Sequence, residues 1–136
     1  MDCVFCKIIN GEIPSNKVYE DDTTFAFLDI SPQNLGHTLV ITKNHHKNIL
    51  EIEDNELQKL ILVVKKVANA IQKGLNAEGF NVFTNTGSIA GQVIFHIHFH
   101  LVPRFAGDGI RFIITKKNYQ GQEKEIIQKI RKNLIN

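Results

Sequence analysis

The run GQVIFHIHFHLVPR, residues 91–104, constrains the fold of this chain most strongly, because His96, His98 and His100 alternate in it with apolar residues. A period of two is typical of a β-strand, whose successive side chains point to opposite faces of a sheet. The three histidines therefore share one face, and the other face is apolar: Phe95, Ile97, Phe99 and Leu101. Three of the six histidines of the chain lie within five residues, so we interpret the polar face as functional rather than accidental.

The rest of the pattern predicts an α+β domain, built on a five-stranded antiparallel sheet with one long helix and a C-terminal helix. We expect the strands at 17–20, 24–30, 37–42, 80–85 and 92–104, where β-rich runs are separated by turn residues. We interpret residues 1–136 as a single domain, whose first residues, 1–14, form a short turn or helix.

Apolar spacing predicts both longer helices. Residues 54–75 repeat apolar side chains at i, i+3, i+4 and i+7, with Asp54 as the N-cap and Asn76 as a stop signal. That helix is expected to cover the apolar face of the histidine strand. A second apolar stripe lies in the tail 119–136, on Ile126, Ile127, Ile130 and Leu134. We expect the tail to dock on the domain or on a partner subunit.

Composition excludes several classes of protein. The apolar share is 43%, the charged share is 22% and the net charge is +2, values that are typical of globular domains. Because the lysines are dispersed, we expect no nucleic-acid partner. We expect no membrane partner either, since no apolar run approaches the length of a transmembrane span. The simplest location is then the cytoplasm, where Cys3 and Cys6 stay reduced.

The histidine face allows two kinds of chemistry. Histidines two apart on a strand can bind one metal ion, or one histidine can attack a phosphate that its neighbours hold. The glycine-containing loop 86–92 can bring backbone N–H groups close to an anion, and Gln92 can add a donor. Asp29 lies at the end of a predicted strand, and its carboxylate can accept hydrogen bonds from the two hydroxyls of a ribose. These surroundings favour a nucleotide phosphate.

The sequence also resembles the histidine triad (HIT) family, whose signature alternates three histidines with apolar residues. Here the signature is His96-Ile97-His98-Phe99-His100-Leu101-Val102, preceded by AGQ. The similarity extends to CVFCKIINGEIPS, FAFLDISPQNLGHTLVITKNH and NVFTNTGSIAGQ, and so covers nearly the whole chain up to about Arg104. The pattern is most similar to the nucleotide-binding, phosphoramidase-type branch of the family.

This resemblance implies a homodimer whose two sheets join, and an enzyme that hydrolyses purine nucleotide derivatives at the α-phosphate. His98 would attack phosphorus and form a nucleotidyl-histidine intermediate, with His100 beside the phosphate or leaving group and His37 and His96 supporting the triad. The implied nucleotide-binding residues are Phe5, Ile8, Phe27, Asp29, Ile30, Asn85, Gly91 and Gln92. Val93 replaces a Ser or Thr of many relatives, which affects the expected rate and leaving-group preference.

The cysteine pair has the spacing of a zinc clip, but two thiolates supply half of a tetrahedral site. The partners could be His45, His46 or a histidine of the triad. By resemblance to zinc-binding relatives, the set is Cys3, Cys6, His45 and His96, with a structural zinc ion. The alternatives are two small, partly buried residues or a redox pair.

Two further functions remain open on the sequence. One is a dinucleoside polyphosphate hydrolase, and the other is a nucleotide-sensing or scaffold module without significant turnover. A catalytic metal bound by all three histidines of the triad is a third alternative, but it would leave Asp29, Gln92 and the glycine loop without a role.

Overall fold

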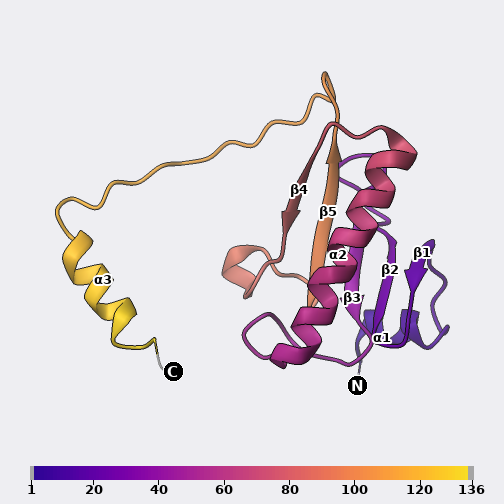
Figure 1. The fold of residues 1–136 in the computed structure, drawn as a ribbon, viewed down its shortest axis with the longest axis horizontal. Helices are drawn as coiled ribbons and strands as arrows, with labels where there is room; N and C mark the ends of the chain where they lie inside the picture. Colours follow the sequence, from indigo (N-terminus) through magenta and orange to yellow (C-terminus); the bar gives the residue numbers. More distant parts are fainter. Residues whose placement is uncertain (1, 135–136) are drawn as a thin grey trace.

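Five antiparallel strands form one sheet in the order β1-β2-β3-β5-β4 (Figure 1). The strands are β1 (Lys17–Glu20), β2 (Thr24–Leu28), β3 (Thr38–Thr42), β4 (Gly79–Phe83) and β5 (His98–Arg104). The helices are α1 (Val4–Ile9), α2 (Asp54–Leu75), the short 3-10 helix η1 (Ser88–Ala90) and α3 (Glu123–Arg131). The predicted α+β architecture is confirmed. The computed structural model describes residues 2–134, so residues 1, 135 and 136 of the predicted domain lie outside it.

The two faces of the sheet are covered by different elements. Helix α2 covers one face, where its apolar stripe packs with alternate residues of the strands: Ala26, Val40, Leu60, Val63, Val64, Val67, Ile71, Ile97, Phe99 and Leu101. The other face carries a smaller apolar cluster beside α1: Cys3, Phe5, Phe25, Phe27, Leu39 and Ile41. His98 and His100 point to this second face because they alternate with Phe99 and Leu101.

The histidine strand is shorter than its sequence pattern predicts. Its pairing with β3 ends at Ile41 opposite His98, so β5 begins at His98 rather than at residue 92. Before that point the Ile97 amide donates to the carbonyl of His46, at 2.7 Å, instead of to a strand. The preceding residues are therefore held by a loop. Ile97 packs on the α2 side as predicted, but Phe95 does not: it is 39% exposed and lines a pocket with Cys3 and His45.

The ends of α2 show where local signals decide a boundary and where they do not. Asn76 adopts the left-handed conformation at the C-cap, as a stop signal should. Asp54 is not the N-cap, because Glu53 occupies that position without a side-chain cap hydrogen bond. Asp54 and Glu56 instead lie in the first turn, where their charges favour the positive end of the helix.

Beyond β5 the chain leaves the sheet. Residues 109–134, which we name the arm, contain an extended segment followed by α3, and Figure 1 shows that segment passing outward beyond the β4 edge. The predicted C-terminal helix is present, but none of its residues is buried, so it does not dock on its own domain. Within residues 2–134, no helix combines the length and apolar character that a membrane crossing requires.

Candidate functional site

The histidine run divides between two clusters. Asp29, His37 and His100 lie together, and the His98 ring lies 4.9 Å from that of His100. We name these four residues the histidine–aspartate cluster. His96 lies with Cys3, Cys6 and His45, which we name the cysteine–histidine cluster. The three histidines of the triad therefore do not converge on one point, which argues against a single metal ion bound by all three.

A backbone carbonyl assigns the tautomer of His98. Nδ1 lies 2.8 Å from the carbonyl oxygen of His96, and because a carbonyl only accepts, Nδ1 carries the proton. Nε2 then keeps its lone pair. All described polar side-chain atoms that are shut off from water have a hydrogen-bond partner, whereas Nε2 of His98 has none. This nitrogen is therefore not fully shut off from water, and its lone pair could act as a nucleophile.

A chain of hydrogen bonds assigns the opposite tautomer to His100. The amide of Gln33 donates to Nδ1 of His37 at 3.0 Å, so the proton of His37 resides on Nε2. That nitrogen donates to Nδ1 of His100, also at 3.0 Å. His100 consequently carries its own proton on Nε2, which has no partner among the described residues. A nucleophilic nitrogen and an N–H donor thus lie on neighbouring positions of one face.

Burial keeps these imidazoles neutral. It lowers the pKa of His98 and of His37, and it lowers the pKa of His100 to about 4. The carboxylate of Asp29 opposes these shifts without reversing them. At pH 7 both imidazoles are therefore neutral. Nε2 of His98 keeps its lone pair, and Nε2–H of His100 donates as the N–H of a neutral ring rather than of a positively charged one.

Aromatic rings hold the two imidazoles in place. Phe83, from the end of β4, stacks on His100 with ring centroids 4.5 Å apart and planes 12° from parallel. Phe5, from α1, meets the His98 ring edge to face at 5.1 Å. The hydroxyl of Thr84 donates to the carbonyl of His98 at 2.8 Å. No sequence pattern singled out Phe83 or Thr84, because their proximity to the two histidines depends on the β4–β5 register.

Asp29 lies at the end of β2 beside His37. One of its oxygens accepts the Ser31 amide at 2.8 Å, and the other lies 3.7 Å from Nε2 of His37. Asp29, His37 and His100 could in principle hold a metal ion, since their donor atoms lie within 4.8 Å of one another. The proton on Nε2 of His37 argues against this, because metal binding there would need that lone pair.

The loop before β5 is braced by Gln92. This side chain is buried, accepts the Gly87 amide at 2.9 Å, and donates to the carbonyls of Lys47 and Ile94. Its polar atoms are thus used within the loop. Gly91 has a φ of 98° and packs on Asn85, whose Nδ2 would lie 3.5 Å from an added Cβ. The positive φ therefore favours glycine at position 91.

The predicted base-binding residues differ in exposure. Phe5 and Phe27 are buried and meet edge to face at 5.5 Å, and Ile8 packs partly buried against the same cluster. Ile30 is 90% exposed, which leaves an apolar side chain in water beside Asp29. The structure brings an apolar wall and a carboxylate together near the two histidines.

The cysteine–histidine cluster brings four donor atoms together. Nδ1 of His96 lies 3.5 Å from Sγ of Cys3 and 3.6 Å from Sγ of Cys6, and Nδ1 of His45 lies 3.5 Å from Sγ of Cys6. His46 does not belong to the cluster, since its Nε2 pairs with Glu56 at 3.0 Å. Of the two adjacent histidines, the structure therefore selects His45.

The geometry of this cluster fits a zinc ion. With ordinary zinc–sulfur and zinc–nitrogen bonds, tetrahedral ligands place S and N about 3.6 Å apart, close to the three separations above. Nε2 of His96 donates to the carbonyl of Thr42 at 2.6 Å, which leaves the Nδ1 lone pair directed at the sulfurs. Two thiols cannot both donate well to that one lone pair. Burial and the Cys3 sulfur also raise the pKa of the Cys6 thiol. A bound cation would lower this pKa again, because it stabilises the thiolate.

Comparison with known proteins identifies similar chains. Residues 10–107 match the family model described as HIT domain. An uncharacterized HIT-like protein of Methanocaldococcus jannaschii is 51% identical over 107 residues, which cover 79% of this chain and 82% of that protein. An adenosine 5′-monophosphoramidase of Candida albicans is 45% identical over 106 residues, or 75% of this chain and 70% of that protein.

Solved structures show the same fold. The crystal structure of a HIT-family member from Bacillus subtilis has a TM-score of 0.92 and 40% identity, and the match covers 100% of this chain and 99% of that one. A zinc-bound histidine triad family protein from Mycobacterium smegmatis has a TM-score of 0.78 and 34% identity, with 97% of each chain covered.

Proposed function

Because this chain belongs to the HIT domain family, we propose that it is a purine-nucleotide-binding hydrolase. It cleaves nucleoside phosphoramidates, or related nucleotidyl compounds, at the α-phosphate through a nucleotidyl-histidine intermediate on His98. The opposite tautomers of His98 and His100 are the observation that carries this proposal. The similarity to an adenosine 5′-monophosphoramidase supports the substrate class.

The proposed reaction has two steps. Nε2 of His98 forms a bond to the α-phosphorus while the bond from phosphorus to the leaving group breaks, and the leaving group departs with a proton from solvent. Water then attacks the same phosphorus while the bond from phosphorus to Nε2 breaks, which releases the nucleoside monophosphate, the neutral imidazole and a proton to solvent. In both steps the Nε2–H of His100 donates to the phosphate, where negative charge builds up.

Residues around the two histidines would hold the nucleotide. Asp29 keeps a partly exposed carboxylate for the ribose hydroxyls. Asn85 and Gly91 line the phosphate side, and Gln92 supports their loop through its backbone contacts. The apolar wall for the base consists of Phe5, Ile8, Phe27 and Ile30.

Trapping the intermediate tests this function. Wild-type protein is mixed with adenosine 5′-phosphoramidate, quenched rapidly under alkaline conditions and weighed by intact mass spectrometry. We expect a mass gain of one nucleotidyl group on wild type and none on His98→Ala, which should lose turnover by about 10⁴-fold. AMP should still raise the melting temperature of His98→Ala. The matched control is His46→Ala, which should keep turnover because His46 pairs with Glu56 outside the cluster.

Three outcomes would contradict the proposal. Undiminished hydrolysis by His98→Ala would show that His98 is not the nucleophile. Faster cleavage of a dinucleoside tetraphosphate than of the phosphoramidate would favour a dinucleoside polyphosphate hydrolase. A melting-temperature rise with AMP but negligible wild-type turnover would favour a nucleotide-sensing module.

We also propose that Cys3, Cys6, His45 and His96 bind a structural zinc ion. The separations of their donor atoms and the zinc-bound relative support this. Four protein ligands would close the coordination sphere, so the metal would stabilise the fold rather than supply a reactive water. Thiolate ligands require a reducing compartment, which agrees with the proposed cytoplasmic location.

A homodimer that continues the sheet is the proposed assembly. Strand β4 lies at an edge of the sheet, its residues GFNVF carry no charge, and Val82 is 48% exposed. The opposite edge, β1, carries Lys17 and Glu20, charges of the kind that discourage edge pairing. The β4 edge is therefore the better site for a second sheet.

A further inference from the structure

The protons of His37 and His100 have two self-consistent arrangements. In the assigned arrangement, Nε2–H of His37 donates to Nδ1 of His100, whose own proton is then on Nε2. In the reversed arrangement both protons would be on Nδ1, and Nδ1–H of His100 would donate to Nε2 of His37. The separation of 3.0 Å suits either direction of donation. Only the assigned arrangement leaves His100 an N–H for the proposed phosphate.

The backbone amide of Gln33 selects between these arrangements. Its nitrogen lies 3.0 Å from Nδ1 of His37 and can only donate, so in the reversed arrangement two N–H groups would face each other. The Asp29 carboxylate also favours a proton on Nε2 of His37, but at 3.7 Å it lies beyond an ordinary hydrogen bond. The position of the β2–β3 loop, residues 29–37, therefore decides which nitrogen of His100 carries the proton.

Asn34 holds the β2–β3 loop against β5. It is partly buried, whereas the other residues of the run SPQNL are exposed. Its Nδ2 donates to the Pro103 carbonyl at 2.9 Å and to Oδ2 of Asp108 at 3.2 Å, and its Oδ1 accepts the Leu35 amide at 3.0 Å. Its carbonyl accepts the His37 amide at 3.1 Å. One side chain thus joins the loop to the strand that carries the N–H donor.

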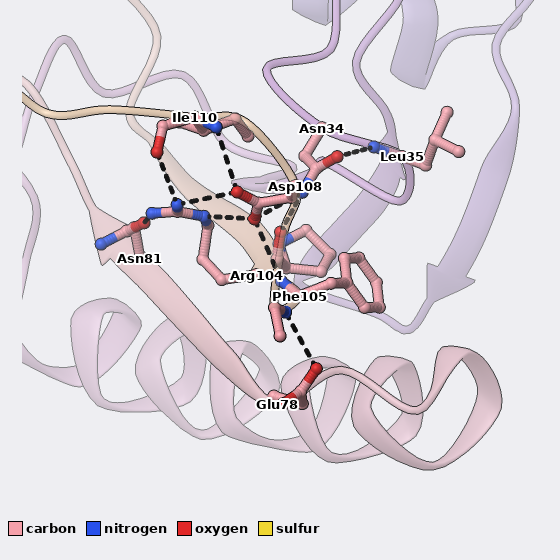
Figure 2. Close-up of polar contacts among 10 residues, drawn as sticks. Asn34, Leu35, Glu78, Asn81, Arg104, Phe105, Asp108 and Ile110 are labelled. Atoms are coloured by element: carbon pink, nitrogen blue, oxygen red, sulfur yellow. Dashed lines mark hydrogen bonds and ion pairs between the residues drawn. The ribbon is translucent and has the colours of Figure 1, made fainter.

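Asp108 is itself held in place by an ion pair (Figure 2). The guanidinium of Arg104, the last residue of β5, donates to both carboxylate oxygens of Asp108, at 2.8 and 3.1 Å. The amides of Phe105 and Ile110 donate to the same carboxylate at 3.0 and 3.1 Å. The guanidinium and these amides hold the pKa of the Asp108 carboxyl well below its usual range, so it remains an acceptor for Asn34.

Other contacts keep the loop folded when Asn34 is replaced. The Asp29 amide donates to the His37 carbonyl at 2.9 Å, and one carboxylate oxygen of Asp29 accepts the Ser31 amide at 2.8 Å. Both contacts are independent of the Asn34 side chain. A substitution of Asn34 should therefore displace the Gln33 amide without unfolding the loop.

We propose that Asn34 is a positioning residue for the reaction. It holds the β2–β3 loop so that the Gln33 amide selects the tautomer of His37, and the proton of His100 consequently stays on Nε2. Asn34 acts through the loop backbone rather than by contact with the reacting atoms. This inference rests on the proposed function, because the proton matters for turnover only if His100 contacts the phosphate.

Imidazole NMR tests the selection without a substrate. Full-length ¹⁵N-labelled protein is measured as purified at pH 7, above the lowered pKa of both rings, so that the ¹⁵N shifts give the share of each tautomer. Wild type should carry the proton of His100 on Nε2. In Asn34→Ala the ratio of Nε2–H to Nδ1–H should fall about tenfold, because one hydrogen bond no longer selects the tautomer. His37→Gln and His100→Gln assign the resonances.

Turnover and ligand binding should follow the tautomer. For Asn34→Ala, kcat/KM for adenosine 5′-phosphoramidate should fall in proportion to the Nε2–H share of His100, by about twofold where that share is halved. Saturating AMP should return the proton of His100 to Nε2, because the phosphate is a strong acceptor. A merely structural role of Asn34 would produce no such return.

Two further variants separate Asn34 from its surroundings. Asn34→Asp keeps the acceptor for the Leu35 amide but loses both donor contacts. Because its charge would face the Asp108 carboxylate, it should shift the tautomers at least as far as Asn34→Ala. Asn81→Ala is the matched control: it removes another partly buried asparagine, which accepts from Arg104 at 3.0 Å, and should leave the tautomers unchanged.

Failure of the inference and failure of the proposed function are distinguishable. Unchanged tautomers in folded Asn34→Ala and Asn34→Asp would overturn the inference. An equal shift in Asn81→Ala would overturn it as well, since it would indicate a general loosening around the ion pair. Tautomers that shift as expected in a protein that does not hydrolyse the phosphoramidate would contradict the proposed function and leave Asn34 as the residue that sets the tautomer.

Discussion

His96 and His98 are two residues apart in one run, yet the backbone prepares them for different chemistry. The Thr42 carbonyl takes Nε2–H of His96 and leaves Nδ1 as a ligand atom. The His96 carbonyl takes Nδ1–H of His98 and leaves Nε2 as a nucleophile. The chemistry open to each histidine therefore depends on which of its ring nitrogens donates to a main-chain oxygen.

The two clusters that these histidines enter each contain two buried and two partly buried residues. His96 is fully buried between two sulfurs and a carbonyl, whereas His100 stays partly open. Phe5 connects the clusters, because its ring meets both the His96 ring, at 5.8 Å, and the His98 ring. We call the cysteine–histidine cluster, which the proposed zinc ion would close, the closed cluster, and the histidine–aspartate cluster, which would admit the substrate, the open cluster.

Removing a ligand from the closed cluster should have the largest effect on stability. Cys3→Ser should reduce bound zinc from about one per chain to near zero and lower the free energy of unfolding by about 4 kcal/mol, the stabilisation from a ligand a thousandfold above its Kd. Elemental analysis and urea denaturation measure the two quantities.

Adjacent histidines provide the control for zinc binding. His45→Gln should lose the metal as Cys3→Ser does, whereas His46→Gln should retain it, because only His45 faces the Cys6 sulfur. A zinc-free wild type with full stability would show that the cluster is not a metal site.

The second prediction concerns a substitution that changes the open cluster alone. His100→Ala should lower kcat by about 10²–10³-fold, because the phosphate loses an N–H donor in the transition state. His100→Gln should recover part of this loss, since an amide can donate from a similar position. Zinc content should stay unchanged in both variants, and a loss of zinc would show that the two clusters are not separable.

The third prediction concerns the stability of the folded protein at acid pH. In the folded protein the pKa of His100 is about 4, against about 6.5 for an unfolded chain. Between these values the unfolded state binds more protons, so His100 should reduce stability as pH falls from about 6.5 to about 4. The loss should be about 1–2 kcal/mol, because partial exposure of the ring weakens the effect.

Comparison with a variant isolates this contribution. Urea denaturation of wild type and His100→Gln across that pH range should give a shallower decline for the variant, while acid release of zinc affects both proteins. Identical declines would show that His100 is not held neutral by burial.

Much of this arrangement could be predicted from the sequence. The alternation in 96–101 predicted the two faces of β5, and the spacing in 54–75 predicted α2, because both are local patterns. The stack of Phe83 on His100 could not be predicted, since it depends on the register of strands distant in sequence. The tautomers depend on carbonyls of Thr42 and His96, whose directions no residue pattern encodes. The resemblance supplied His45, but only the geometry explains why His46 is excluded.

Val93 gives the smallest expected effect and tests where the boundary between the clusters lies. It is 80% exposed and lines a pocket of about 530 Å³ together with Cys3, His45 and Phe95, residues on the side of the closed cluster. Val93→Thr adds a hydroxyl without changing volume, so stability should stay within about 0.5 kcal/mol and kcat/KM for the phosphoramidate within about threefold. A tenfold gain would instead show that this position contacts the phosphate or leaving group, and that the open cluster extends back along the loop beyond Gln92.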